Sequence, residues 1–280
     1  MDRVIWEQHP VLRDPAAIIA FEGWGDAGES SSAAARHLIE TVDSERIASI
    51  DADEFFDFQV RRPVVLVDDD GSREIAWPET EIWMVTPPWS SRDLVVVTGP
   101  EPHARWKVFS TDLIAVLRTL GVRQAVTMGA FIGQVPHTLP VPLVGSGVDP
   151  DTLERHALFA SDYEGPTGIV GVLNSTLTGA GIETVSVWAA VPHYLSQQEY
   201  PPGALALVDK ALEIVGMELD TTDLTLAVSE FRDQVDAAMD DAEIREYVEE
   251  LENQSLVEEE TDGDPVDRLV EEIEDFLRDS

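Results

Sequence analysis

The residues best suited to ligand chemistry near the start of the chain form a glycine-rich turn at positions 23–28, Gly-Trp-Gly-Asp-Ala-Gly. The turn satisfies the pattern G-x-G-x-x-G, follows a predicted strand and opens a predicted helix. Asp51 ends the next predicted strand, where a dinucleotide site would place its ribose-binding acid. Dinucleotide binding through this turn is therefore one interpretation.

Two residues within the turn argue against that interpretation. Asp26 puts a carboxylate where a pyrophosphate would rest on the helix N-terminus. Trp24 is bulky for a turn whose backbone a ligand must approach closely. The same residues fit a structural role, because Asp26 as N-cap with Glu29 three residues later makes a start resembling a capping box.

A second turn, Tyr-Glu-Gly-Pro-Thr-Gly at positions 163–168, directly precedes an uncharged predicted helix. Exposed amides at a helix start can bind an anion. The turn lacks the Gly-Lys-Ser/Thr ending of a Walker loop. The favoured interpretation is a structural turn in which Pro166 and the two glycines set backbone angles before a closely packed helix.

Three histidines, His103, His137 and His193, lie beside prolines or near predicted strand ends. Ligands bind at the carboxyl ends of strands in open α/β sheets. No pair has the spacing of H-E-x-x-H and no G-x-S-x-G turn accompanies them, so no metal site is predicted. A lone histidine at a strand end is more often structural than catalytic. If the chain is an enzyme, Asp26, Glu101 or His193 would supply the acid–base chemistry.

Strands that alternate with amphipathic helices must position these residues. Apolar runs predict strands at 16–21, 46–50, 81–85, 94–98, 123–128 and 184–190, and helices at 30–42, 106–120, 169–178 and 203–215. A hairpin is expected over residues 64–75, around the turn Asp70-Gly71. The alternation predicts an α/β core domain over residues 1–220, with a largely parallel mixed sheet covered on both faces.

The composition excludes several classes of function. A net charge of −37 repels phosphate backbones and anionic lipid, so neither nucleic acid nor a membrane is an expected partner. This charge serves solubility or offers a negative face to a basic protein. The absence of cysteine excludes disulfides and thiolate metal sites. No signal peptide is recognised at the N-terminus, and a cytoplasmic protein is expected.

The composition changes after about residue 220. Residues 221–280 contain 22 acidic residues against 4 arginines, and their apolar residues recur at helical spacing. The last such stripe runs from Val266 to Leu277. The sequence therefore predicts an acidic helical extension over residues 221–280, which packs on its own domain or on another subunit.

Taken in order, the motifs resemble the bacterial branch of the proteasome assembly chaperone family over about residues 10–215. They are the turn at 23–28, Arg-Arg-Pro at 61–63, Gly-Pro-Glu-Pro at 99–102 before Trp106, Pro-His-Thr at 136–138, the turn at 163–168, and Trp188 with Pro-His-Tyr-Leu at 192–195. The acidic extension is similar to that of the longer, actinobacterial-type members. The resemblance implies a three-layer α/β/α fold similar to phosphorylase and hydrolase-like folds, and self-association.

For archaeal and eukaryotic relatives, the resemblance also implies binding to proteasome α subunits during ring assembly. Archaeal relatives can end in a hydrophobic-Tyr-x tail that enters pockets of the α ring. The last residues here, Phe-Leu-Arg-Asp-Ser at 276–280, do not match that tail. Binding by that route is therefore not expected of this chain.

The resulting hypothesis is a non-enzymatic, assembly-chaperone-like protein that binds other proteins and needs no cofactor. Its partners would be itself, as a homo-oligomer such as a trimer, and proteasome α subunits or another protein. The alternative is a nucleoside- or nucleotide-binding enzyme of hydrolase or phosphorylase type, or a dinucleotide binder. The ligand-binding residues expected in either case are Gly23, Trp24, Asp26, Gly28, His137, Tyr163, Gly165, Thr167, Gly168 and Tyr194.

Overall fold

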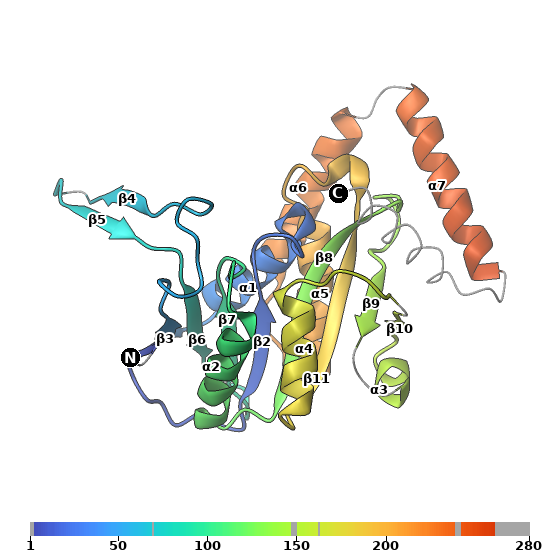
Figure 1. The fold of residues 1–280 in the computed structure, drawn as a ribbon. Helices are drawn as coiled ribbons and strands as arrows, with labels where there is room; N and C mark the ends of the chain where they lie inside the picture. The colour runs from blue at the N-terminus through green and yellow to red at the C-terminus, as the bar shows by residue number, and fades with distance from the viewer. Residues whose placement is uncertain (1–2, 69, 147–149, 162, 239–241, 261–280) are drawn as a thin grey trace.

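The computed structural model describes residues 3–68, 70–146, 150–161, 163–238 and 242–260 (Figure 1). The strands are β1 (Val4–Trp6), β2 (Ala16–Ala20), β3 (Ser44–Ile50), β4 (Val64–Val67), β5 (Arg73–Ala76), β6 (Thr80–Val85), β7 (Leu94–Thr98), β8 (Gln124–Gly133), β9 (Leu143–Ser146), β10 (Phe159–Ala160) and β11 (Glu183–Pro192). The α-helices are α1 (Ser30–Glu40), α2 (Trp106–Thr119), α3 (Pro150–Arg155), α4 (Ile169–Gly179), α5 (Pro201–Val215), α6 (Thr222–Ala238) and α7 (Ala242–Glu260). Short 3₁₀ helices cover Ala27–Glu29 and His193–Leu195.

The main sheet has nine strands in the order β1-β3-β6-β7-β2-β8-β11-β9-β10. Its centre is parallel, since β7, β2, β8 and β11 all pair in the same direction. Strands β1, β3 and β6 add antiparallel pairs on one flank, and β9 pairs antiparallel with β11 on the other. The prediction of a mixed sheet with a parallel core is confirmed.

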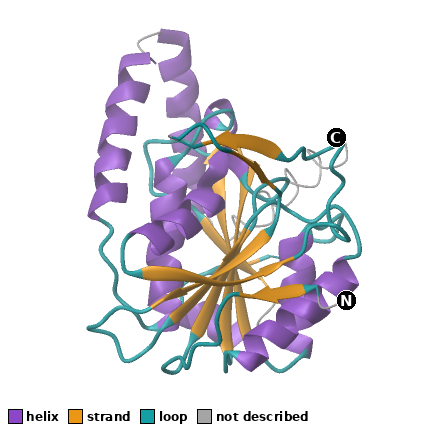
Figure 2. Cartoon of the chain, turned by 90° about the vertical axis from the view of Figure 1, so that its left-hand side faces the viewer, coloured by secondary structure: helices purple, strands orange, loops and turns teal. Residues whose placement is uncertain are grey.

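Helices cover both faces of the sheet, so the fold has three layers (Figures 1 and 2). Alternate residues of β2 serve the two layers: Ile18 packs beneath α1, α5 and α6, whereas Ile19 packs beneath α2 and α4. Every residue of β2 is fully buried. This is the pattern of a strand enclosed on both faces, and it explains the continuous apolar run in the sequence.

The helices begin and end where the sequence predicts. Helix α2 buries Phe109, Leu113 and Leu117 along one face, and Gly121 follows it with a positive φ of 82°. The expected strands and hairpin also form, within a few residues of their predicted bounds. Strands β1, β9 and β10 and helix α3 were not predicted, because each is too short to show a periodic pattern.

The acidic extension begins against the core. Val228, Phe231 and Val235 of α6 are buried as their helical spacing predicts, and the Phe231 ring meets Tyr200 edge-on at 5.6 Å. Helix α7 buries Val248 and Leu251. The apolar stripe predicted from residue 266 to residue 277 lies outside the described residues. Within the described chain, no helix has both the length and the apolar character needed to cross a bilayer.

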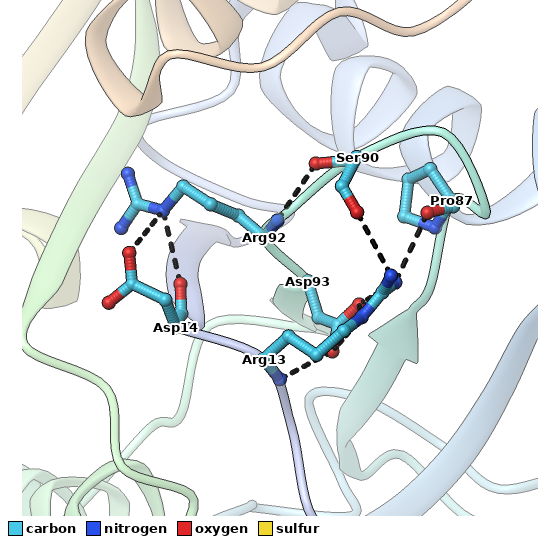
Figure 3. A network of polar contacts seen from close by, with 6 residues as sticks. All are labelled: Arg13, Asp14, Pro87, Ser90, Arg92 and Asp93. Atoms are coloured by element: carbon cyan, nitrogen blue, oxygen red, sulfur yellow. Dashed lines mark hydrogen bonds and ion pairs between the residues drawn. The ribbon is translucent and has the colours of Figure 1, made fainter.

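Ion pairs tie together the amino-terminal ends of β2 and β7 (Figure 3). The Asp93 carboxylate is almost fully buried and accepts hydrogen bonds from the Arg13 backbone amide at 2.6 Å and from its guanidinium Nε at 3.0 Å. Arg13 also donates to the Ser90 and Pro87 carbonyl oxygens. The buried Asp93 carboxylate thus joins the two loops that precede the central strands, and the Asp14–Arg92 ion pair joins them a second time.

We predict that Asp93→Asn lowers the free energy of unfolding by about 2–3 kcal/mol, because it removes charge-assisted hydrogen bonds from a buried site. The control is Asp14→Asn, which alters a half-exposed carboxylate that pairs with Arg92 and Arg123 in the same region. Its loss should stay within about 1 kcal/mol. Urea unfolding of both variants measures the difference, and equal losses would contradict this account.

Candidate functional site

A cavity of about 500 Å³ opens at the carboxyl-terminal ends of the central parallel strands. Phe131 and Ile132 reach it from β8, and Trp188 reaches it from β11. Both predicted turns, at 23–28 and 163–168, contribute to the lining. A cavity of this size and position is the usual ligand site of an open α/β sheet.

The first turn is tied to β8 beside the cavity. The Ala130 amide donates to the Gly25 carbonyl oxygen at 2.8 Å, and the backbones of Asp26 and Ala130 form an isolated parallel β-bridge. Gly28 adopts a positive φ of 57°, and a Cβ there would lie 2.8 Å from the Tyr200 Cβ. Glycine at this position thus allows both the left-handed backbone and the close approach of Tyr200.

Asp26 caps helix α1. Its side chain is 8% exposed, and its Oδ1 accepts hydrogen bonds from the Ser31 amide at 2.7 Å, the Ser31 hydroxyl at 2.7 Å and the Ser32 amide at 3.1 Å. These are amides that a bound phosphate would use. The predicted capping box is wrong in its register, because Glu29 occupies the N-cap position of α1 and its exposed side chain makes no capping bond. Asp26 instead satisfies the helix start from outside the helix.

The dinucleotide interpretation also fails at Asp51, the expected ribose-binding acid. Asp51 follows β3, and β3 is separated from β2 by β6 and β7 in the sheet. A ribose-binding acid would need to follow a strand beside β2. The first turn is thus a helix start without the neighbouring acid of a dinucleotide site.

Glu101 plays the same part at the second turn. Its Oε1 accepts a hydrogen bond from the Ile169 amide at 2.7 Å, at the start of α4. Gly168 lets Glu101 and Trp24 come close, because a Cβ there would lie 2.9 Å from Glu101 Oε1 and 3.2 Å from Trp24 Cε3. The two turns therefore both contact Glu101. The start of α1 is satisfied by the Asp26 carboxylate and the start of α4 by the Glu101 carboxylate.

Trp188 forms one wall of the cavity. It lies opposite Gly129 in the neighbouring strand, where an added Cβ would be 2.5 Å from the indole ring. Its Nε1 donates to Ser186 Oγ at 2.9 Å, which fixes the ring orientation. Tyr163, which also lines the cavity, donates its hydroxyl to the Pro166 carbonyl oxygen at 2.8 Å.

The remaining predicted residues gather elsewhere, in an aromatic cluster beneath α7. The Tyr194 hydroxyl lies 2.9 Å from His137 Nδ1 and accepts a hydrogen bond from the His137 amide at 3.0 Å. His193 meets Tyr194 edge-on at 5.1 Å and Tyr247 of α7 at 5.8 Å. Burial lowers the pKa of His137, although Asp236 and Glu252 partly oppose this.

The structure thus separates the expected site residues into two groups. The cavity is lined by Gly23, Trp24, Asp26, Gly28, Tyr163 and Thr167, with Glu101, Gly165 and Gly168 in the adjoining turns. His137, His193 and Tyr194 belong to the cluster under α7. The catalytic candidates Asp26, Glu101 and His193 therefore do not all face one cavity.

Sequence reasoning missed the walls contributed by Phe131, Trp188 and Gln198. The first two belong to strands whose apolar runs are indistinguishable from core. Across the part of the chain that the structure describes, no three His, Asp or Glu side chains gather where a metal ion could bind.

Comparison with known proteins identifies the class. The sequence matches the PAC2 family over residues 20–239, which is most of the chain. A PAC2 family protein from Streptomyces avermitilis is 42% identical, with a TM-score of 0.78 over 84% of this chain and 100% of its own. A Mycobacterium tuberculosis protein described as a proteasome-assembly chaperone homologue is 38% identical, with a TM-score of 0.76 over 83% of this chain and 99% of its own.

The chain therefore belongs to the PAC2 family, as the order of its motifs indicates. A Pyrococcus furiosus homologue of proteasome-assembly chaperones shares the fold, with a TM-score of 0.60 over 90% of this chain and 99% of its own, at 14% identity. No functionally curated protein matches the sequence.

We predict that Asp26→Ala lowers the free energy of unfolding by about 1–2 kcal/mol, because α1 loses its cap. The matched control is Glu29→Gln, which changes an exposed carboxylate at the same helix start and should cost less than about 0.5 kcal/mol. Chemical denaturation distinguishes the two. A cost for Asp26→Ala no greater than that of the control would show that the cap is dispensable.

The lowered pKa of His137 predicts a pH dependence. Below its ordinary pKa of 6.5, the unfolded chain takes up the proton before the folded one does, so stability is lost as the pH falls through that value. Urea midpoints at about pH 7.5 and about pH 5.5 measure the loss. His137→Gln should show a smaller loss than the parent, whereas His9→Gln, at an exposed histidine, should show the same loss. An undiminished loss in His137→Gln would assign the effect to other groups.

Proposed function

We propose that this protein is a non-enzymatic, assembly-chaperone-like protein that binds other proteins and acts as a homo-oligomer such as a trimer. Besides other copies of itself, it would bind proteasome α subunits or another protein whose assembly it assists. Membership of the PAC2 family and a 38% identical relative described as a proteasome-assembly chaperone homologue support this proposal.

The observation that carries the proposal is the β4–β5 hairpin, which projects from the body as an arm (Figure 1). It forms a sheet of its own, with Val65 opposite Ile75 and Leu66 opposite Glu74. Six large apolar side chains of the arm and its base are each at least 50% exposed: Val64, Val65, Leu66, Val67, Ile75 and Trp77. A two-stranded ribbon of this kind is not stable by burial of its own side chains.

Strand β4 is apolar on both faces, whereas Arg73 and Glu74 of β5 lie opposite Val67 and Leu66. Successive residues of a strand point to opposite sides, so Val65 and Val67 lie on one face while Val64 and Leu66 lie on the other. Strand pairing within the described chain also leaves the outer edge of each hairpin strand free to pair. Exposed apolar patches and free strand edges are features of protein-binding surfaces.

The most fitting occupant of the arm is a second copy of this chain. Two bodies that each carry a net charge of −37 repel one another, so copies can approach closely only through segments that are poor in charge. Strand β4, Val-Val-Leu-Val, is uncharged. A groove of about 830 Å³ at the arm's base carries Arg36, Arg62, Glu40 and Glu79, which offers both signs of charge to a partner segment.

We predict that the double variant Val65→Lys, Leu66→Lys converts the oligomer to a monomer, because it places a charge on each face of the arm. The matched control is Val11→Lys, Leu226→Lys. It changes the same residue types at exposed positions of the body, 99% and 57% exposed, and adds the same charge. Light scattering coupled to size exclusion gives the masses, and circular dichroism melts confirm that both variants fold.

The arm variant and its control also test whether proteasome α subunits are the partner. Purified proteasome α subunits should bind the parent chain and the control more tightly than the arm variant in a surface-binding measurement. A parent chain that is monomeric at every concentration, or an arm variant that keeps the parent's mass, would refute self-association through the arm. A parent oligomer that shows no binding to α subunits would leave assembly of another protein as the function.

A further inference from the structure

We propose that the cavity at the carboxyl ends of β8 and β11 is a binding site for a small organic cation with an aromatic or apolar body. The proposal is independent of the arm and of the protein-binding function. It rests on three features of the cavity: its aromatic walls, the charges of its lining, and the state of the two helix starts that border it.

Aromatic rings dominate the walls. Trp24, Phe131, Tyr163 and Trp188 all line the cavity, and Trp24 is 49% exposed. The faces of aromatic rings are electron-rich and attract ammonium and guanidinium groups, most strongly in the case of Trp. A volume of about 500 Å³ falls within the range of sites for small organic molecules.

The charged side chains in the lining are carboxylates. Asp26 and Glu29 contribute them, and none of the described residues that line the cavity is Lys, Arg or His. An anionic ligand would therefore meet two negative charges and no compensating cation, in a chain whose overall charge is −37. A cation would be attracted by both.

The two helix starts that border the cavity cannot reverse this preference. In an open α/β sheet such helix starts supply amides and a positive dipole end to phosphate groups. Here Asp26 already accepts the Ser31 and Ser32 amides of α1, and Glu101 already accepts the Ile169 amide of α4. The protein thus neutralises both dipole ends with its own carboxylates, and the cavity is left without a phosphate site.

The position of Trp24 makes it the main specificity residue in this proposal. It belongs to the first turn, its ring packs close to Gly168 of the second turn, and it lines the same cavity as Trp188 and Asp26. A cation held over this indole would also lie in the field of Asp26. Because Trp24 is half exposed, its replacement should spare the core.

The test uses three probes with one ring and different charges: benzamidine, benzamide and benzoate. Titration of the full chain, followed by tryptophan fluorescence and by ligand-observed NMR, should give the order of affinity benzamidine, then benzamide, then benzoate. Benzamidine should bind at least about tenfold more tightly than benzoate, and raised salt should narrow that ratio.

Two variants distinguish the cavity from general attraction to an acidic surface. Trp24→Leu should lower the affinity for benzamidine by about fivefold or more, because it removes an aromatic face from the cavity. Trp89→Leu replaces another exposed tryptophan, which lies outside the cavity lining, and should leave the affinity unchanged. Equal affinity for benzoate and benzamidine, equal affinity of the two variants, or no binding of any probe would each overturn the proposal.

Discussion

The burial of the central strands on both faces is the constraint on which the rest of the structure depends. Strand β2 has no exposed residue, so both helical layers must be present before it can leave water. Because β7, β2, β8 and β11 are parallel, the connections that lead out of these strands emerge at the same edge. The two glycine-rich turns meet there for that reason, although about 140 positions separate them in the chain.

At that edge the loops are stabilised by their own carboxylates. Asp26 and Glu101 satisfy amides that the helix starts would otherwise leave unpaired. The same two interactions decide the chemistry of the cavity, since they remove the positive helix ends that favour phosphate. A structural requirement, the capping of α1 and α4, thus turns a common nucleotide-binding geometry into an acidic pocket with aromatic walls.

The molecule combines a highly acidic body with an arm whose strand β4 is apolar and uncharged. The net charge of −37 opposes the approach of two copies, and the uncharged strand β4 adds nothing to that repulsion. The aromatic cluster of His137, Tyr194 and Tyr247 joins the core to α7, and burial within it lowers the pKa of His137.

Local patterns in the sequence determined much of this protein: the buried strands, the helix bounds, the hairpin and a structural role for Asp26 at the start of α1. These features depend on spacing and residue type within a short segment. Tertiary structure alone decided that Glu101 caps α4 and that Trp188 lines the cavity. It also decided that His137 and His193 lie under α7 and not beside Asp26. Each of those contacts joins residues far apart in the chain, and the order of strands in the sheet, which no local pattern encodes, brings them together.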